Sequence, residues 1–217
     1  MKTRFTWLLD LDNTLHNASP HIFPHINRSM TAYISEHLRL SHEEAGALRA
    51  QYWRSYGATL LGLLRHHDTD PRHFLWHTHQ FPDLARMMVS EVGLRHALRR
   101  LHGRKILFSN GPAHYAEAVL ELLNIGDLFD AVYSVERVRF QSKPQAGGFR
   151  HLLQREGLVA RRCVLVEDSL PNLRAAKKLG MKTVWITRDT RQPACVDAKT
   201  TSVLKLPALA TKLGIRM

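Results

Sequence analysis

Short, largely apolar runs recur along this chain, and each ends at a cluster of polar or turn-forming residues. The five runs are Phe5–Leu9, Lys105–Phe108, Ala131–Ser134, Cys163–Val166 and Lys182–Ile186. Continuous apolar runs of this length are typical of strands that are buried on both faces of a parallel sheet. We therefore expect five strands, all in one sheet.

Helical patterns separate most of these runs. They cover Pro112–Leu123, Ala146–Glu156 and Pro171–Leu179. The last has Pro171 at its start, and Gly180 follows its end, which is the usual punctuation of a helix. Strands that alternate with helices predict the α/β class, with a doubly wound, Rossmann-like parallel sheet.

One stretch, from about His21 to Arg100, breaks the alternation because helix follows helix without a buried strand. Its helical patterns include Ile22–Ile34, Glu43–Tyr56, Pro71–His79 and Leu84–Met88. We predict that residues 17–90 form an all-α domain inserted just after the first strand. Residues 1–16 and 91–217 then form the α/β core domain.

The charge and composition of the chain limit the classes of molecule that it is expected to bind. The chain has 31 Lys and Arg against 19 Asp and Glu, a net charge of +12, which favours anionic partners. The basic residues are scattered and form no stripe interleaved with aromatics, so we expect no specific nucleic-acid binding. There is no apolar run of membrane-spanning length, so we expect no membrane partner. Two cysteines and no leader-like start predict a cytoplasmic location.

Polar residues stand at or just beyond the ends of four predicted strands. Asp10 and Asp12 follow the first, Ser109–Asn110 follow the second along the chain, Lys143 lies on the loop after the third, and Glu167–Asp168 follow the fourth. Ligands of open parallel sheets bind beyond the carboxyl ends of the strands. We therefore expect these residues to meet in one crevice.

That crevice suits a phosphoryl group. Four carboxylates at close quarters repel, and a hard divalent cation such as Mg²⁺ relieves the repulsion. Lys143 adds fixed positive charge and Ser109 a hydroxyl donor, which is what phosphoryl transfer requires. Asp10 can form an aspartyl-phosphate. Asp12 can protonate the leaving oxygen and then take a proton from the attacking water.

In order and spacing, Asp10-x-Asp12-x-Thr14, Ser109, Lys143 and Glu167–Asp168 resemble the motifs of the haloacid dehalogenase (HAD) superfamily. The resemblance implies Asp10 as nucleophile and Asp12 as general acid and base. It also implies Mg²⁺ held by Asp10, Glu167, Asp168 and the Asp12 backbone carbonyl, with Ser109, Asn110 and Lys143 on the phosphate. The superfamily's dehalogenases lack an acid where Asp12 stands, so a phosphatase or phosphomutase is expected. The helical insertion resembles the superfamily's first-type (C1) cap.

Within the superfamily, the chain resembles the pyrimidine 5′-nucleotidase group. The likeness lies in Asp10–His16, Ile26–Met30, Tyr56–Leu63, Asp70–Pro71 and Glu167–Leu173. It implies hydrolysis of nucleoside 5′-monophosphates such as UMP and CMP by a monomer or homodimer. Tyr56, Gly57, Thr59 and Asn27 are candidates for substrate contacts from the cap. Two alternatives remain: a phosphatase for a sugar phosphate or phosphoglycolate, and a basic binding protein on the same fold without turnover.

Overall fold

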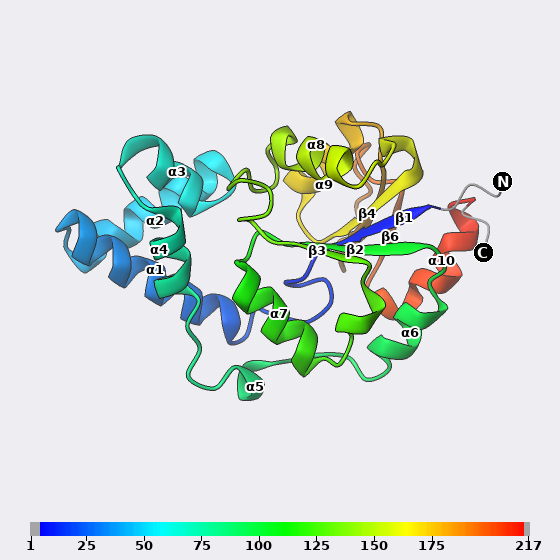
Figure 1. The fold of residues 1–217 in the computed structure, drawn as a ribbon, viewed down its shortest axis with the longest axis horizontal. Coiled ribbons are helices and arrows are strands. Elements are labelled where there is room, and N and C mark those ends of the chain that lie inside the picture. Colours follow the sequence, from blue (N-terminus) through cyan, green and yellow to red (C-terminus); the bar gives the residue numbers. More distant parts are fainter. Residues whose placement is uncertain (1–4, 215–217) are drawn as a thin grey trace.

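The structure is a computed structural model that describes residues 5–214. In this part of the chain six parallel strands form one sheet in the order β3-β2-β1-β4-β5-β6 (Figure 1). The strands are β1 Thr6–Leu9, β2 Arg104–Phe108, β3 Ala131–Tyr133, β4 Cys163–Glu167, β5 Lys182–Ile186 and β6 Ala198–Thr200. The five predicted strands and the α/β class are confirmed.

The central strand β1 is buried on both faces because helices cover both sides of the sheet. Trp7 and Leu9 pack into one hydrophobic cluster and Leu8 into another, as alternation along a strand requires. Helices α6 (Leu94–Arg100), α7 (Ala113–Leu122) and α10 (Leu206–Lys212) line the first cluster. Helices α8 (Ala146–Arg155) and α9 (Leu170–Lys178) line the second, on the opposite face (Figure 1).

Short 3-10 helices lie in the connections of the core at η1 (Gly126–Leu128), η2 (Ala160–Arg162) and η3 (Val203–Lys205). Ala116, Val119 and Leu120, which recur at helical spacing in α7, are buried, and Leu123, just beyond its end, is partly buried. No helix within residues 5–214 has both the length and the apolar character needed to cross a membrane.

Helices fill the chain between β1 and β2, as the sequence predicted. Ahead of α6, which precedes β2, they are α1 (Ile22–Leu38), α2 (His42–Tyr56), α3 (Thr59–His66), α4 (Pro71–Thr78) and α5 (Leu84–Met87). Figure 1 shows α1 to α4 side by side at one end of the molecule. Ser41 begins α2 with a capping box that includes Glu44, and Gly57 ends it in a left-handed conformation. The division of the chain at residues 17 and 90 stays a prediction.

These helices share a hydrophobic cluster to which the core contributes. Tyr33 of α1, Tyr52 of α2, Leu60 of α3 and Phe74 of α4 lie in it together with Val135 from the loop after β3. The cluster therefore ties the helical segment to a loop of the α/β core.

The loop of residues 135–144 also touches the helical segment further along. Phe140 packs against the same cluster, and the guanidinium carbon of Arg72 lies 5.8 Å from its ring centroid. Arg139 and Phe140 both have left-handed φ values, 56° and 60°, which residues other than glycine rarely adopt. Gly57 faces Pro144, whose Cδ lies 2.6 Å from where a β-carbon on Gly57 would stand.

Gly57→Ala is expected to destabilise the protein more than Gly93→Ala. Both glycines have positive φ, +83° and +94°, so alanine at either site costs about 1–2 kcal/mol of backbone strain. Gly93 faces open space, whereas a methyl group at Gly57 meets Pro144. Denaturant unfolding of both variants measures the difference. Equal losses of unfolding free energy in the two variants would show that a methyl group at Gly57 does not clash with Pro144.

Candidate active site

The turn after β1 fixes the first acidic residue of the site. Asp10 is buried, and its backbone N–H continues the strand ladder by donating to the Val166 carbonyl at 3.0 Å. The chain then turns through Asn13, which has a left-handed φ of 58° and accepts a hydrogen bond from the Ala18 N–H at 3.0 Å. Within this turn the Thr14 hydroxyl donates to Asp10 Oδ2 at 3.2 Å. The turn therefore anchors the Asp10 carboxylate at the carboxyl edge of the sheet.

Lys143 joins three strand ends through its ammonium group. Nζ donates to Asp10 Oδ1 at 2.7 Å, to Glu167 Oε2 at 2.7 Å and to the Phe108 carbonyl at 2.6 Å. The side chain is only 1% exposed. An ammonium group has three protons to donate, and all three have partners here. Residues that stand far apart in sequence thus meet as the strand-end pattern predicted.

Asn110 holds the backbone of Lys143. Its Oδ1 accepts from the Lys143 N–H at 2.8 Å, and its Nδ2 donates to the Lys143 carbonyl at 2.9 Å. The neighbouring Ser109 is buried, and its hydroxyl oxygen accepts from the Gly111 N–H at 2.9 Å. The sequence placed Asn110 on the phosphate; the structure shows that its side-chain amide is engaged by the Lys143 loop.

The acidic residues can hold a divalent cation. Asp10, Glu167 and Asp168 each offer a carboxylate oxygen, and these three oxygens lie within 4.8 Å of one another. The Ser169 N–H donates to Glu167 Oε1 at 3.2 Å, and Trp185 Nε1 donates to the Asp168 carbonyl at 2.8 Å. Hard oxygen donors at this spacing fit a cation such as Mg²⁺.

Burial and mutual repulsion shift the ionisation of these groups. Burial, followed by the charge of Glu167, raises the pKa of Asp10 to about 7. Burial also raises the pKa of Glu167 to about 7, with a further contribution from Asp168 and partial compensation by Lys143. Burial alone would lower the pKa of Lys143, but the two carboxylates raise it above its ordinary value. The ammonium group is therefore charged at neutral pH, and the carboxylates carry unfavourable negative charge that a cation would relieve.

Asp12 lies beside this cluster and is held by two residues that sequence reasoning missed. Its Oδ1 accepts from the Tyr115 hydroxyl at 2.5 Å and lies 3.0 Å from His16 Nε2. Burial and then the charge of Asp12 raise the pKa of Tyr115 far above its ordinary value, so this phenol is a neutral donor. His16 stands four residues after Asp12, which is a local signal. Tyr115 comes from α7, and nothing near it in sequence points to Asp12.

Four residues of the helical segment were candidates for substrate contacts: Tyr56, Gly57, Thr59 and Asn27. The Tyr56 hydroxyl lies 2.6 Å from His66 Nε2, and the Thr59 hydroxyl donates to the Arg49 carbonyl at 3.2 Å. Asn27 Oδ1 accepts from Arg49 Nη1 at 2.8 Å. These three side chains therefore have partners within the helical segment. Gly57 faces the loop that carries Lys143, through its approach to Pro144.

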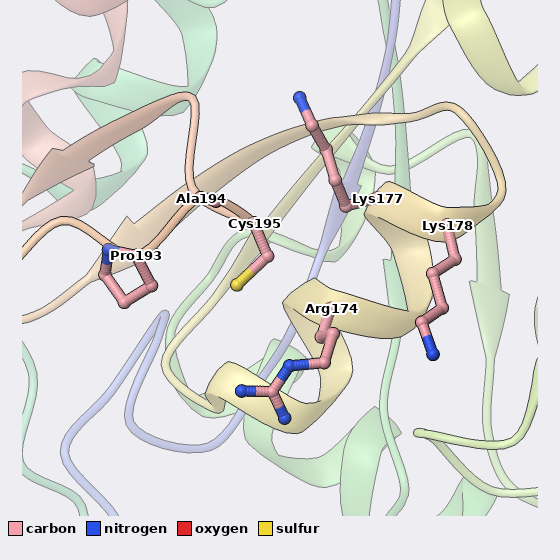
Figure 2. A pocket seen from close by; sticks show the side chains of 6 residues that line it. All are labelled: Arg174, Lys177, Lys178, Pro193, Ala194 and Cys195. Carbon is pink, nitrogen blue, oxygen red and sulfur yellow. The ribbon is translucent and has the colours of Figure 1, made fainter.

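A hollow that none of the carboxylate-site residues lines differs from that site in chemistry. Figure 2 shows Arg174, Lys177 and Lys178 of α9 on one side and the 193–195 segment with Cys195 on the other. Lys177 Nζ bonds to Asp197, outside the lining residues. The hollow is basic and has no carboxylate among its lining residues, so it lacks the groups that the carboxylate site brings together.

Fold and site together define a Rossmann-like α/β core of the haloacid dehalogenase type, with its acidic residues and lysine at the carboxyl edge of the central strands. A sequence model of the haloacid dehalogenase-like hydrolases matches residues 6–180. The chain belongs to this family of hydrolases.

Among the curated proteins to which this chain is similar, several are named as phosphatases. Phosphoglycolate phosphatase of Pseudomonas putida is 23% identical over 210 residues, which cover 91% of this chain and 74% of that protein. Hexitol phosphatase B of Escherichia coli is 31% identical over 106 residues, which cover 47% of each chain. The sequence similarity thus extends over nearly the whole chain in one relative and about half in the other.

Solved structures share the fold. A HAD phosphatase from Thermococcus onnurineus superposes with a TM-score of 0.66 at 22% identity, covering 97% of this chain and 98% of that one. The HAD hydrolase YfnB of Bacillus subtilis, described as bound to magnesium, has a TM-score of 0.61 at 15% identity, covering 96% and 99%. At these identities the likeness establishes the architecture.

Lys143→Met is expected to destabilise the protein in a pH-dependent way. In the wild-type protein, the raised pKa values of Asp10 and Glu167 mean that the folded state binds more protons than the unfolded state. The free energy of unfolding of the wild-type protein therefore falls as the pH rises from about 4 to about 7. Without Lys143 the two buried carboxylates lose their counter-charge, which lowers the free energy of unfolding by about 3 kcal/mol at pH 8. The loss shrinks at pH 5.5, where both carboxylates take protons.

Denaturant unfolding at the two pH values measures this effect. Lys178→Met is the matched control, because Lys178 is exposed and lies outside the site. A loss of stability in Lys143→Met that is the same at both pH values would contradict the electrostatic account.

Proposed function

We propose that this chain hydrolyses phosphate monoesters through an aspartyl-phosphate on Asp10. One observation carries the proposal: the buried ammonium group of Lys143 lies 2.7 Å from both Asp10 and Glu167. The ammonium group can bind a phosphoryl group, and the carboxylate beside it can attack the phosphorus. The neighbouring acidic cluster can hold a divalent cation. The family membership and the phosphatase names of the relatives support the same chemistry.

The reaction proceeds in two transfers. The Asp10 carboxylate attacks phosphorus, the bond from phosphorus to the ester oxygen breaks, and that oxygen takes a proton from Asp12. Water then attacks the phosphoryl group, Asp12 takes a proton from the water, and the bond from Asp10 to phosphorus breaks to release phosphate. General acid and base catalysis of this kind contributes about 10²–10⁴-fold to the rate.

The remaining side chains bind and orient the phosphoryl group. Lys143 offers positive charge and the Ser109 hydroxyl a donor, while Asn110 fixes the Lys143 backbone. Asp10, Glu167 and Asp168, with the Asp12 backbone carbonyl, would hold Mg²⁺. When bound, this ion supplies positive charge against the phosphoryl oxygens.

We favour a small phosphorylated hydroxy acid, sugar or polyol as the substrate, because the relatives are named for phosphoglycolate and hexitol phosphates. A pyrimidine nucleoside 5′-monophosphate is the second candidate, and the resemblance in Tyr56–Leu63 supports it. Residues 17–90 would serve as a C1-type cap that selects among these esters. The cytoplasmic location and the monomeric or homodimeric state stay predictions of the sequence.

Purified protein with Mg²⁺ is expected to release phosphate from a panel of esters that includes phosphoglycolate, hexitol and sugar phosphates, UMP and CMP. Asp10→Asn keeps the shape of the side chain but removes the nucleophile, so kcat is expected to fall by about 10³-fold or more. Asp127→Asn, on the surface beside Arg95, is the matched control and keeps full activity. Relative kcat/KM values across the panel rank the substrate classes. No release from any ester would refute the function.

Mg²⁺ is expected to raise the melting temperature, and to do so more at pH 8 than at pH 5.5. The ion binds ionised carboxylates, whereas Asp10 and Glu167, with pKa values of about 7, are largely protonated at the lower pH. At about 100 times its Kd, the ion adds about 2.7 kcal/mol to the free energy of unfolding. Asp168→Asn is expected to weaken the shift. Thermal scans that show the same shift in this variant would place the ion elsewhere.

A further inference from the structure

The general acid proposed above has an unusual pair of contacts. Both partners of the Asp12 side chain bind the same oxygen, Oδ1, with the Tyr115 hydroxyl at 2.5 Å and His16 Nε2 at 3.0 Å. Within residues 5–214 no hydrogen bond to Asp12 Oδ2 is present. The Asp12 side chain is 17% exposed, so it is not sealed from the solvent. One oxygen is thus held and the other is left for a substrate.

The Tyr115 ring is fixed independently of its hydroxyl. Tyr115 is 1% exposed and belongs to the hydrophobic cluster beneath the sheet. Its ring centroid lies 5.2 Å from that of Phe81 and 5.8 Å from that of His79, both on the chain that returns from α4 to the core. Packing therefore sets where the hydroxyl points, and that hydroxyl reaches Asp12.

His16 is placed for the same contact. Its ring is buried, and in the described part of the chain its Nδ1 has no hydrogen-bond partner. A buried polar atom without a hydrogen-bond partner is unfavourable, so Nδ1 does not stabilise His16 in this position. A carboxylate only accepts, so His16 donates to Asp12 from Nε2. The contact with Asp12 is what the imidazole supplies.

We propose that Tyr115 and His16 are positioning residues that hold Asp12 by Oδ1, so that Oδ2 carries the proton to the leaving oxygen. The inference rests on the proposed function, in which Asp12 is the general acid. Two donors on Oδ1 concentrate negative charge there, which leaves the proton of the acid form on Oδ2. During the first transfer this proton moves from Oδ2 to the ester oxygen as the bond from phosphorus to that oxygen breaks.

Tyr115→Phe removes one donor and keeps the ring, and the choice of ester reveals the effect. An alkyl phosphate has a poor leaving group that needs protonation, whereas 4-nitrophenyl phosphate leaves readily without it. In Tyr115→Phe, kcat/KM for the best alkyl ester of the panel is expected to fall by about 10–100-fold, a part of the full contribution of a general acid. For 4-nitrophenyl phosphate the fall is expected to stay below about threefold.

Three further variants complete the design. Asp12→Asn removes the general acid itself and is expected to lower kcat/KM for the alkyl ester selectively, and by more than Tyr115→Phe does. His16→Gln retains an N–H donor and is expected to show the same selectivity, but with a smaller loss than Tyr115→Phe. Tyr133→Phe is the matched control: Tyr133 is also 1% exposed, and its hydroxyl donates to a carboxylate, Glu156, outside the site. It is expected to leave the ratio of the two kcat/KM values unchanged.

The outcomes separate the two proposals. Suppose that Asp12→Asn lowers kcat/KM selectively for the alkyl ester, whereas Tyr115→Phe and His16→Gln lower kcat/KM equally for both esters or leave both values unchanged. The positioning role is then wrong, and the phosphatase function stands. If Asp12→Asn itself shows no preference, Asp12 is not the general acid and the positioning role falls with it. If the wild-type protein hydrolyses neither ester, both proposals are refuted. Selective loss in Tyr115→Phe with an unchanged ratio in Tyr133→Phe supports the inference.

Discussion

The buried ammonium group of Lys143 is the interaction on which the site depends. It offsets part of the negative charge of two carboxylates, Asp10 and Glu167, that stand side by side at the carboxyl edge of β1 and β4. It also bonds to the Phe108 carbonyl at the end of β2, so one side chain joins three adjacent strands of the sheet. Charges this deeply buried are tolerated only when every proton and lone pair near them has a partner. Sheet order and site geometry are therefore inseparable.

The sequence predicted the sheet and the residues at its edge because both follow local rules. Apolar runs such as Cys163–Val166 mark buried strands, and acids that follow them have to lie at the carboxyl edge once the strands pair in parallel. The short edge strand β6, with sequence Ala-Lys-Thr, has no apolar pattern and was missed. Helix α3, which begins at Thr59, itself one of the residues proposed as substrate contacts, was missed as well.

Contacts that depend on how separate elements pack were beyond the sequence. Tyr115 reads as an apolar position of an amphipathic helix, and it is one, since its ring lies in the core. Its hydroxyl finds Asp12 only because α7 packs beneath the turn after β1. The family resemblance implies a role for Asn110 on the phosphate, but no local pattern indicates that its amide pairs with both polar groups of the Lys143 backbone. Local sequence patterns show which residue types are present, whereas the hydrogen-bond partners of those residues depend on how the elements pack together.

The order of elements along the chain has a consequence for how such a protein can diversify. The carboxylates and Lys143 of the site come from the sheet edge or the loops next to it, while α1 to α5 follow one another between β1 and α6. Reshaping α1 to α4, with the packing of His79 and Phe81 on Tyr115 kept, would leave the strand ends in place. Recognition of the ester and the chemistry performed on it would then be free to evolve along separate paths.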